Sequence, residues 1–221
     1  MPLSSLPPVR GLLLAAGSGS RMGRPKALIR PRPDGPTLVE RAVDVLAQGG
    51  CEGVTVVVGA AAEEVMAVLG GADLPGVDTV RCENWSEGMG ASLRAGLAAM
   101  TSRTEVEAVL ISLVDLPDVG PDVVRRILDT RISYTRSGGR PTSAIEWTTS
   151  GAWRSELSRA AYDSVPGHPT LIGRDHWTGV IEVALGDRGA RDYFRAREHR
   201  LVECGDLATG RDVDSPADLD R

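Results

Sequence analysis

The sequence contains almost no lysine, few aromatic residues and few cysteines or histidines. Its 221 residues include a single lysine, Lys26, against twenty-four arginines, and aromatic residues make up 4% of the chain. The three cysteines, Cys51, Cys82 and Cys204, show no CxxC spacing and do not pair with the three histidines at metal-ligand intervals. These absences argue against a clustered zinc site and a disulfide framework, so we expect free, buried thiols.

Long apolar runs and an excess of positive charge are also missing. The apolar stretch at residues 12–16 is too short for a signal peptide, and no run approaches the length of a membrane span. A formal net charge of −5 argues against a nucleic-acid-binding surface. We expect a cytoplasmic protein with no nucleic-acid or membrane partner, folded as one domain over residues 1–221.

Apolar runs alternate with helical patterns along most of the chain. Strands are expected at residues 11–16, 54–58, 77–82, 109–114, 169–173 and 200–204. Helices are expected at residues 38–47 with Thr37 as N-cap, at 62–69, 91–100 and around 187–197, and from Pro121 and Ser215 onward. Continuous apolar strands separated by helices predict a three-layer α/β/α, doubly wound fold with a mostly parallel sheet.

The alternation fails between about residues 130 and 158, where serine, threonine, arginine and glycine crowd the chain. A segment of this length and composition inside a compact domain is typical of a lid or of a flexible excursion. We expect an inserted, flexible excursion there.

The single lysine follows a glycine-rich turn that contains Gly17, Gly19 and Gly23. Such glycines let backbone N–H groups converge on an anion, and a lone ammonium beside them indicates a charge directed at phosphate. The turn is not a Walker loop, because Lys26 precedes alanine, and its G-x-G-x-x-x-G spacing is not the dinucleotide fingerprint. The strand at 54–58 also ends without the acidic residue that a ribose requires, which weakens an NAD site.

Two aspartates are candidate ligands for Mg²⁺. Asp115 follows the apolar strand at 109–114, at the edge where open α/β sheets bind ligands, although it can also be read as a turn residue before Pro117. Asp214 precedes the expected C-terminal helix, and the residues alone leave open whether it binds metal or belongs to the helix cap.

Six short motifs resemble, in order and spacing, those of the MobA-like nucleotidyltransferases, specifically the molybdenum cofactor cytidylyltransferases. The motifs are Leu13-Leu-Ala-Ala-Gly-Ser-Gly-Ser-Arg-Met-Gly-Arg-Pro-Lys-Ala-Leu28, Asn84-Trp-Ser-Glu-Gly-Met-Gly-Ala-Ser92, Val114-Asp-Leu-Pro117, Gly167-His-Pro-Thr-Leu-Ile-Gly173, Gly186-Asp-Arg-Gly-Ala-Arg191 and Asp212-Val-Asp-Ser-Pro-Ala-Asp-Leu219. The resemblance implies transfer of CMP from CTP to the terminal phosphate of molybdopterin, with Mg²⁺ as cofactor and pyrophosphate as product.

The resemblance also implies roles for single residues. Lys26, Arg21 and Asp115 match the family's catalytic positions, Asp115 and Asp214 its metal ligands, and His168 a residue that faces the acceptor. The nucleotide would contact Ala15, Ala16, Gly17, Ser18, Gly19, Ser20, Arg21, Met22, Gly23, Lys26, Asn84, Gly88 and Ser92.

Several alternatives remain at this stage. The loop reads Leu-Ala-Ala-Gly, as in the cytidylyl branch, whereas guanylyl enzymes tend to have Leu-Ala-Gly-Gly. Because this preference for CTP rests on one residue, a guanylyltransferase stays open. A sugar or polyol phosphate acceptor and a non-catalytic role in delivering molybdenum cofactor, to a molybdenum hydroxylase or its maturation factor, also stay open. Leu116 stands where the family often has glutamine, which removes a polar contact expected for the acceptor.

Overall fold

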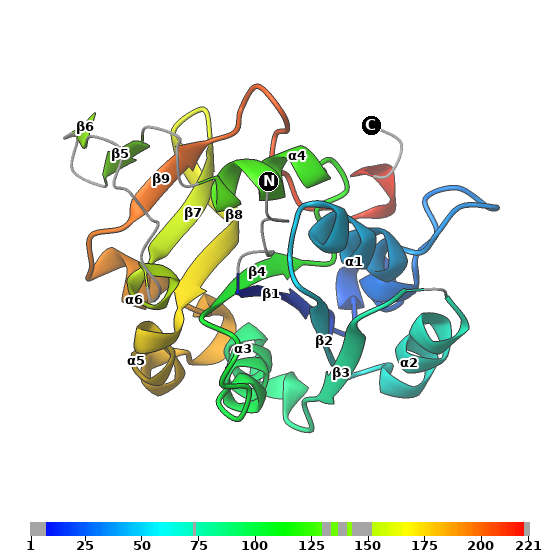
Figure 1. The fold of residues 1–221 in the computed structure, drawn as a ribbon. Helices are drawn as coiled ribbons and strands as arrows, with labels where there is room; N and C mark the ends of the chain where they lie inside the picture. The colour runs from blue at the N-terminus through cyan, green and yellow to red at the C-terminus, as the bar shows by residue number, and fades with distance from the viewer. Residues whose placement is uncertain (1–7, 73, 130–133, 137–140, 143–151, 219–221) are drawn as a thin grey trace.

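The protein folds around one nine-stranded sheet with the strand order β3-β2-β1-β4-β8-β7-β9-β5-β6 (Figure 1). The computed structural model describes residues 8–72, 74–129, 134–136, 141–142 and 152–218. The strands are β1 (Val9–Leu14), β2 (Val54–Val58), β3 (Val77–Arg81), β4 (Ala108–Leu113), β5 (Tyr134–Arg136), β6 (Pro141–Thr142), β7 (Leu157–Tyr162), β8 (Val165–Gly173) and β9 (Arg200–Glu203). The α-helices are α1 (Leu38–Gln48), α2 (Ala62–Gly71), α3 (Met89–Met100), α4 (Pro121–Leu128), α5 (Trp177–Val183) and α6 (Arg191–Arg195).

Helices cover both faces of the sheet, which confirms the predicted three-layer α/β/α architecture. Helices α1, α2 and α4 pack on one face and contribute to one apolar cluster, whereas α3, α5 and α6 pack on the other face and build a second (Figure 1). Every residue of β2 is buried, as expected for a strand covered on both faces. No helix in the described part of the chain has both the length and the apolarity that a membrane crossing requires.

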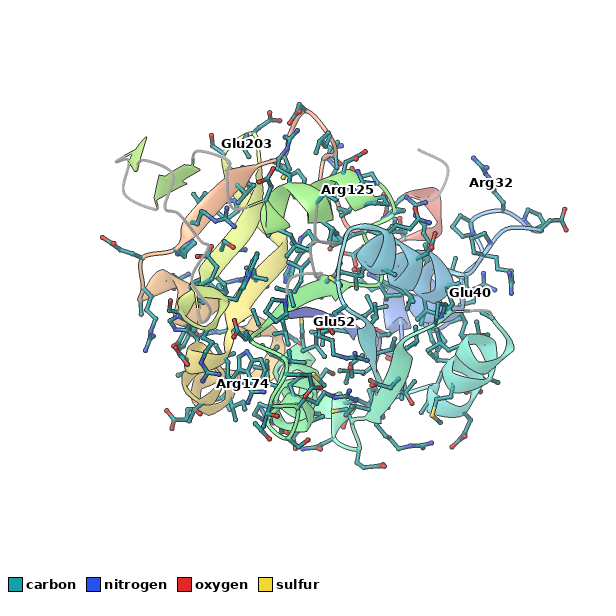
Figure 2. The ribbon with its side chains drawn as sticks, viewed as in Figure 1. Arg32, Glu40, Glu52, Arg125, Arg174 and Glu203 are labelled. Atoms are coloured by element: carbon teal, nitrogen blue, oxygen red, sulfur yellow. The ribbon has the colours of Figure 1, made fainter. Side chains whose placement is uncertain are left out.

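The first half of the sheet is the parallel, doubly wound part. Strands β1, β2, β3 and β4 pair in parallel, and the predicted strand at 54–58 coincides with β2. Helix α1 begins where the sequence places its cap: Thr37 Oγ1 accepts from the Glu40 backbone N–H, and Glu40, labelled in Figure 2, accepts from the Thr37 N–H at 2.7 Å. This reciprocal capping satisfies amide groups that the first helical turn leaves unpaired.

The second half of the sheet departs further from the sequence expectation. Strand β8 begins at Val165, four residues before the expected strand, and runs antiparallel to both β4 and β7. Strand β7 and helix α5 were not predicted. Arg174 joins the two halves, because its Nε donates to the Val106 carbonyl at 2.8 Å and its guanidinium lies over the Trp177 ring (Figure 2).

Two further expectations need adjustment, and a third is not tested. The helix expected around 187–197 is a 3-10 turn at Gly186–Arg188 followed by the five-residue helix α6. The chain after Ser215 forms a single 3-10 turn, Pro216–Asp218, where a helix was expected, although Ser215 N and Oγ both donate to the Asp218 carboxylate. Most of the predicted insertion at 130–158 lies outside the described residues.

Candidate active site

The candidate site lies where the strand order reverses, between β1 and β4. Chain segments leave these neighbouring parallel strands at the same edge of the sheet and diverge. Ligands of doubly wound folds bind at this kind of switch point. The loop after β1 carries the glycines and Lys26, and Asp115 is the second residue of the loop after β4.

The loop after β1 offers free amide donors. The backbone N–H groups of Gly17, Ser18 and Gly19 donate to no acceptor among the described residues. Gly19 has a φ of 63°, and a Cβ there would lie 2.0 Å from the Arg24 carbonyl oxygen, so the turn requires glycine at this position. Such unengaged, neighbouring amides are suited to an anion.

Lys26 lies between two carboxylates. Its Nζ is 2.7 Å from Asp115 Oδ2 and 2.7 Å from Asp214 Oδ1, and Arg21 Nη1 is 3.1 Å from Asp214 Oδ2. Lys26 and Asp115 are 17% and 16% exposed, whereas Asp214 is 43% and Arg21 78% exposed. Buried Ala27 fixes the chain directly after the lysine, so the ammonium is held toward the acidic groups.

The C-terminal segment reaches this edge through backbone contacts with the loop after β4. Val213 N–H donates to the Asp115 carbonyl at 2.9 Å, and the Val213 side chain is buried. A few residues earlier, Thr209 N and Oγ1 both donate to Asp118 Oδ2 at 2.6 Å. These contacts bring Asp214 beside a lysine 188 residues away in the sequence.

The ion pairs change the ionisation of their members. Burial alone would lower the pKa of Lys26, but hydrogen bonds to the Asp115 and Asp214 carboxylates outweigh it and raise the pKa of this lysine. The hydrogen bond from Lys26 lowers the pKa of Asp214, with a smaller contribution from Arg21. Lys26 is therefore a cation and Asp214 an anion throughout the neutral range.

Three carboxylates are close enough to hold a divalent cation. One oxygen from each of Asp115, Asp212 and Asp214 lies within 4.8 Å of the other two. The Oδ1 atom of Asp115 is buried without a hydrogen-bond partner in the described structure, so it keeps free lone pairs for a ligand. Oxygen donors at this spacing fit a hard cation such as Mg²⁺ or Mn²⁺ after small shifts.

A cavity of about 470 Å³ is lined by Asp115 and Lys26. Of the predicted nucleotide contacts, it is lined by Ala15, Ala16, Gly17, Ser18, Gly19, Ser20, Lys26, Gly88 and Ser92. Asn84 is exposed outside this lining and its amide donates to Glu87, and Met22 packs against the apolar core. Lining residues that the sequence did not single out are Trp85, Ser86, Met89 and Asp187.

Comparison with known proteins identifies the family. Residues 11–201 match the MobA-like NTP transferase domain. The chain belongs to this family. The resemblance in the sequence motifs is thereby confirmed at family level.

Two relatives of this MobA-like chain carry names from different enzyme classes. Nicotine blue oxidoreductase from Paenarthrobacter nicotinovorans is 37% identical over 96% of this chain and 95% of its own. A protein named "Probable molybdenum cofactor guanylyltransferase" from Rhodopirellula baltica is 50% identical over 46 residues, 21% of each chain.

Solved structures agree on the fold. Rv0371c from Mycobacterium tuberculosis H37Rv superposes with a TM-score of 0.69 at 27% identity, covering 96% of this chain and 95% of its own. A second Rv0371c structure is described as a complex with manganese; it covers 88% of this chain and 86% of its own, with a TM-score of 0.59 and 26% identity.

His168 lies in a neighbouring cavity. This second space, of about 170 Å³, shares Leu14 and Met89 with the first. Burial, reinforced by the charges of Arg159 and Arg191, lowers the pKa of His168 to about 4. The imidazole of the MobA-like chain is therefore neutral at pH 7, in a cavity that adjoins the one lined by the glycine loop. Leu116 is buried in the apolar core, so it faces neither cavity's interior.

Proposed function

We propose that the protein is a divalent-metal-dependent nucleotidyltransferase that transfers CMP from CTP to the terminal phosphate of molybdopterin and releases pyrophosphate. The observation that carries the proposal is the placement of Lys26 within 2.7 Å of both Asp115 and Asp214, next to unengaged loop amides. Family membership supports nucleotide transfer, and the name of the Rhodopirellula relative supports a molybdenum cofactor acceptor.

The chain's own contribution would be positioning and charge neutralisation. The backbone N–H groups of Gly17, Ser18 and Gly19 would donate to the triphosphate oxygens. Lys26 would also bind the triphosphate, exchanging its carboxylate partners for phosphate. Arg21, at the exposed rim, would reach the outer phosphates. A phosphomonoester is largely ionised at neutral pH, so the acceptor needs no general base and we assign none.

Asp115 and Asp214, together with Asp212, would hold the metal ion. The three carboxylates face the two cations Lys26 and Arg21, so the cluster retains excess negative charge that attracts a divalent cation. A bound Mg²⁺ would supply neutralisation of the charge that develops on the phosphates. The Rv0371c structure described as a complex with manganese supports a divalent cation as the cofactor.

A panel of CTP, GTP, ATP and UTP with Mg²⁺ and molybdenum cofactor tests the proposal through pyrophosphate release. In the presence of molybdenum cofactor, we expect pyrophosphate release with CTP and not with GTP, ATP or UTP. Further reactions replace molybdenum cofactor with sugar or polyol phosphates. Pyrophosphate release only with one of these compounds would identify it as the acceptor instead. A signal confined to GTP would make the protein a guanylyltransferase.

A matched pair of variants tests the site within the same assay. Asp115→Asn should reduce turnover by about two orders of magnitude or more, because it removes a metal-binding charge at the reacting centre. Asp118→Asn is the control: it lies in the same loop, and its remaining oxygen can still accept from Thr209. Equal activity of the two variants would contradict the assigned metal site.

An oxidoreductase is the second candidate, because nicotine blue oxidoreductase matches almost the whole chain. One fold can host different chemistries, so family membership alone does not decide. This candidate predicts consumption of NADH or NADPH in the presence of nicotine blue, with no dependence on nucleotide triphosphate or on Asp115. Such consumption without pyrophosphate release from any nucleotide would replace the first proposal.

A further inference from the structure

The second cavity, which we call the arginine cavity, is lined by cations and by no described carboxylate. Arg159 enters it from β7, Arg191 from the start of α6, and Arg188 from the turn before α6. Its remaining wall is the His168 ring, backbone and small side chains, and an apolar surface formed by Leu14, Met89, Leu93, Ile111 and Phe194.

Two of these arginines have no acidic partner in the described structure. Arg159 Nε and Nη2 lie 3.4 Å from the Gly167 carbonyl oxygen, and its guanidinium carbon is 5.4 Å from the centre of the Phe194 ring. Neither Arg159 nor Arg191 forms an ion pair with any described carboxylate, whereas Arg188 is paired with Asp192 at 3.2 Å.

The uncompensated charges repel one another. Burial, and then the charge of Arg191, lowers the pKa of Arg159, and both arginines contribute to the lowered pKa of His168. Arg159 is partly buried and Arg191 is exposed, so the desolvation cost of an unpaired charge falls mainly on Arg159, and an anion that enters between the two removes that cost. The arginine cavity therefore has the electrostatic character of an anion site, with a neutral imidazole as an additional hydrogen-bonding group.

The arginine cavity adjoins the nucleotide cavity through Leu14 and Met89, which line both. An anion between Arg159 and Arg191 therefore lies next to whatever occupies the glycine loop. The volume of about 170 Å³ accommodates a phosphate and a small organic group, and the Phe194 side of the wall is suited to an apolar or planar body.

We propose that the arginine cavity binds an organic phosphomonoester, the acceptor of the reaction, with Arg159 and Arg191 holding its phosphate. This deepens the proposed function and rests on it for the reaction step. An oxygen of the held phosphate forms a bond to the α-phosphorus of the nucleotide, the bond from that phosphorus to the bridging oxygen breaks, and its electron pair leaves with pyrophosphate. The arginines offset the repulsion between the two phosphate groups as they approach.

Binding of phenyl phosphate, measured by isothermal titration calorimetry on the full chain, tests the site without requiring turnover. Arg159→Gln and Arg191→Gln should each weaken binding by about tenfold or more, because each removes a charge-assisted contact. Arg195→Gln is the matched control: it removes the same charge from the same helix, but Arg195 is 76% exposed, paired with Asp192 and outside the cavity lining. Arg191→Lys, which keeps the charge, should retain part of the affinity.

The same titration in Lys26→Met separates the two cavities. A phosphomonoester bound at the arginines keeps its affinity in this variant, whereas one bound at the glycine loop loses it. Arginine-dependent binding that survives Lys26→Met supports the inference. Binding that is insensitive to Arg159 and Arg191, equally sensitive to Arg195, or lost in Lys26→Met overturns it.

The outcomes also distinguish this inference from the proposed function. Absence of pyrophosphate release with every nucleotide refutes nucleotidyl transfer, while the calorimetric comparison still decides whether the cavity binds a phosphomonoester. In an active enzyme, Arg191→Gln should raise the KM for the acceptor about tenfold or more and leave the KM for CTP unchanged. A rise in the KM for CTP alone would show that Arg191 serves the nucleotide instead.

Discussion

Replacing Lys26 with methionine should tighten metal binding and abolish most of the activity at the same time. The ammonium occupies the space between the carboxylate oxygens of Asp115 and Asp214, which are the atoms proposed to bind the metal. A divalent cation that binds without nucleotide must therefore displace the lysine. Methionine keeps the apolar length of the side chain and removes this competitor.

The size of the effect follows from the exposure of the two pairs. The contact with Asp115 is partly buried, with both side chains less than one-fifth exposed, and the contact with Asp214 is more open. Breaking one partly buried, charge-assisted hydrogen bond and one open ion pair costs about 2 kcal/mol in total. Lys26→Met should therefore bind Mn²⁺ about 30-fold more tightly than the wild type.

The assay is a titration with Mn²⁺ in the absence of nucleotide, followed by electron paramagnetic resonance of the free ion. Arg21→Met is the control, because Arg21 contacts the same Asp214 but is mostly exposed, and its loss should change the affinity less than about threefold. Turnover of Lys26→Met should fall by about a hundredfold or more. Unchanged or weaker Mn²⁺ binding in Lys26→Met would refute the competition argument, and near wild-type turnover would refute the catalytic role.

Other features of the chain allow sharper checks of single positions. Gly19→Ala should lower the free energy of unfolding by about 2 kcal/mol and the Tm by several degrees, because φ at this position is 63° and the new Cβ would clash with the backbone. Gly17→Ala is the control, because a Cβ at position 17 would meet no atom within 4 Å, and its Tm should not change. Equal Tm values for the two variants would contradict the loop geometry. Burial raises the pKa of the Cys51 thiol to about 12, so native protein should react with iodoacetamide at this position far more slowly than urea-unfolded protein, as mass spectrometry can measure. The pKa of His168 is depressed to about 4, so the unfolded state binds the extra proton between about pH 6.5 and pH 4, and stability should fall by up to about 3 kcal/mol as the pH drops through that window. Urea unfolding of His168→Gln should show a correspondingly flatter pH dependence, and an identical slope would exclude this contribution.

The parallel half of the sheet could be predicted because its signals are local. Strand β2 is an unbroken run of valine and threonine bounded by glycines, and Thr37, as an N-cap residue, marks the start of α1. Strand β7 was missed because Ser158 and Arg159 interrupt its apolar pattern, and Arg159 points into a cavity that only the folded sheet creates. Its antiparallel pairing with β8 is a hairpin closed by the two-residue turn Asp163-Ser164, in which both residues have positive φ, and this turn lacks the glycine that usually signals a hairpin.

The candidate site shows the same division. Lys26 and Asp115 could be selected from the loops in which they stand. Asp214 required the family resemblance, since long-range contacts of Val213 with Asp115 and of Thr209 with Asp118 bring it to the site. Asp212 was missed, although the alternation Asp-Val-Asp was a usable signal: in an extended segment with buried Val213, the two flanking aspartates project away from the core together. Asp187 joins the cavity from a distant turn; it stands in the motif Gly186–Arg191, but the resemblance assigned it no contact with the nucleotide.

The position of Lys26 also implies that metal and nucleotide bind cooperatively. A metal ion alone must break the contacts of the ammonium with Asp115 and Asp214, but a triphosphate offers the displaced lysine new anionic partners and offers the metal additional oxygen ligands. The cost of moving the lysine is then shared by two binding events, so each ligand should increase the affinity for the other by the same factor. In Lys26→Met this cost is absent and the coupling should shrink, even though the metal alone binds more tightly. The proposed exchange of one lysine between carboxylates and phosphate would require a compact ammonium at this point, in a chain whose other twenty-four Lys/Arg positions are all arginine.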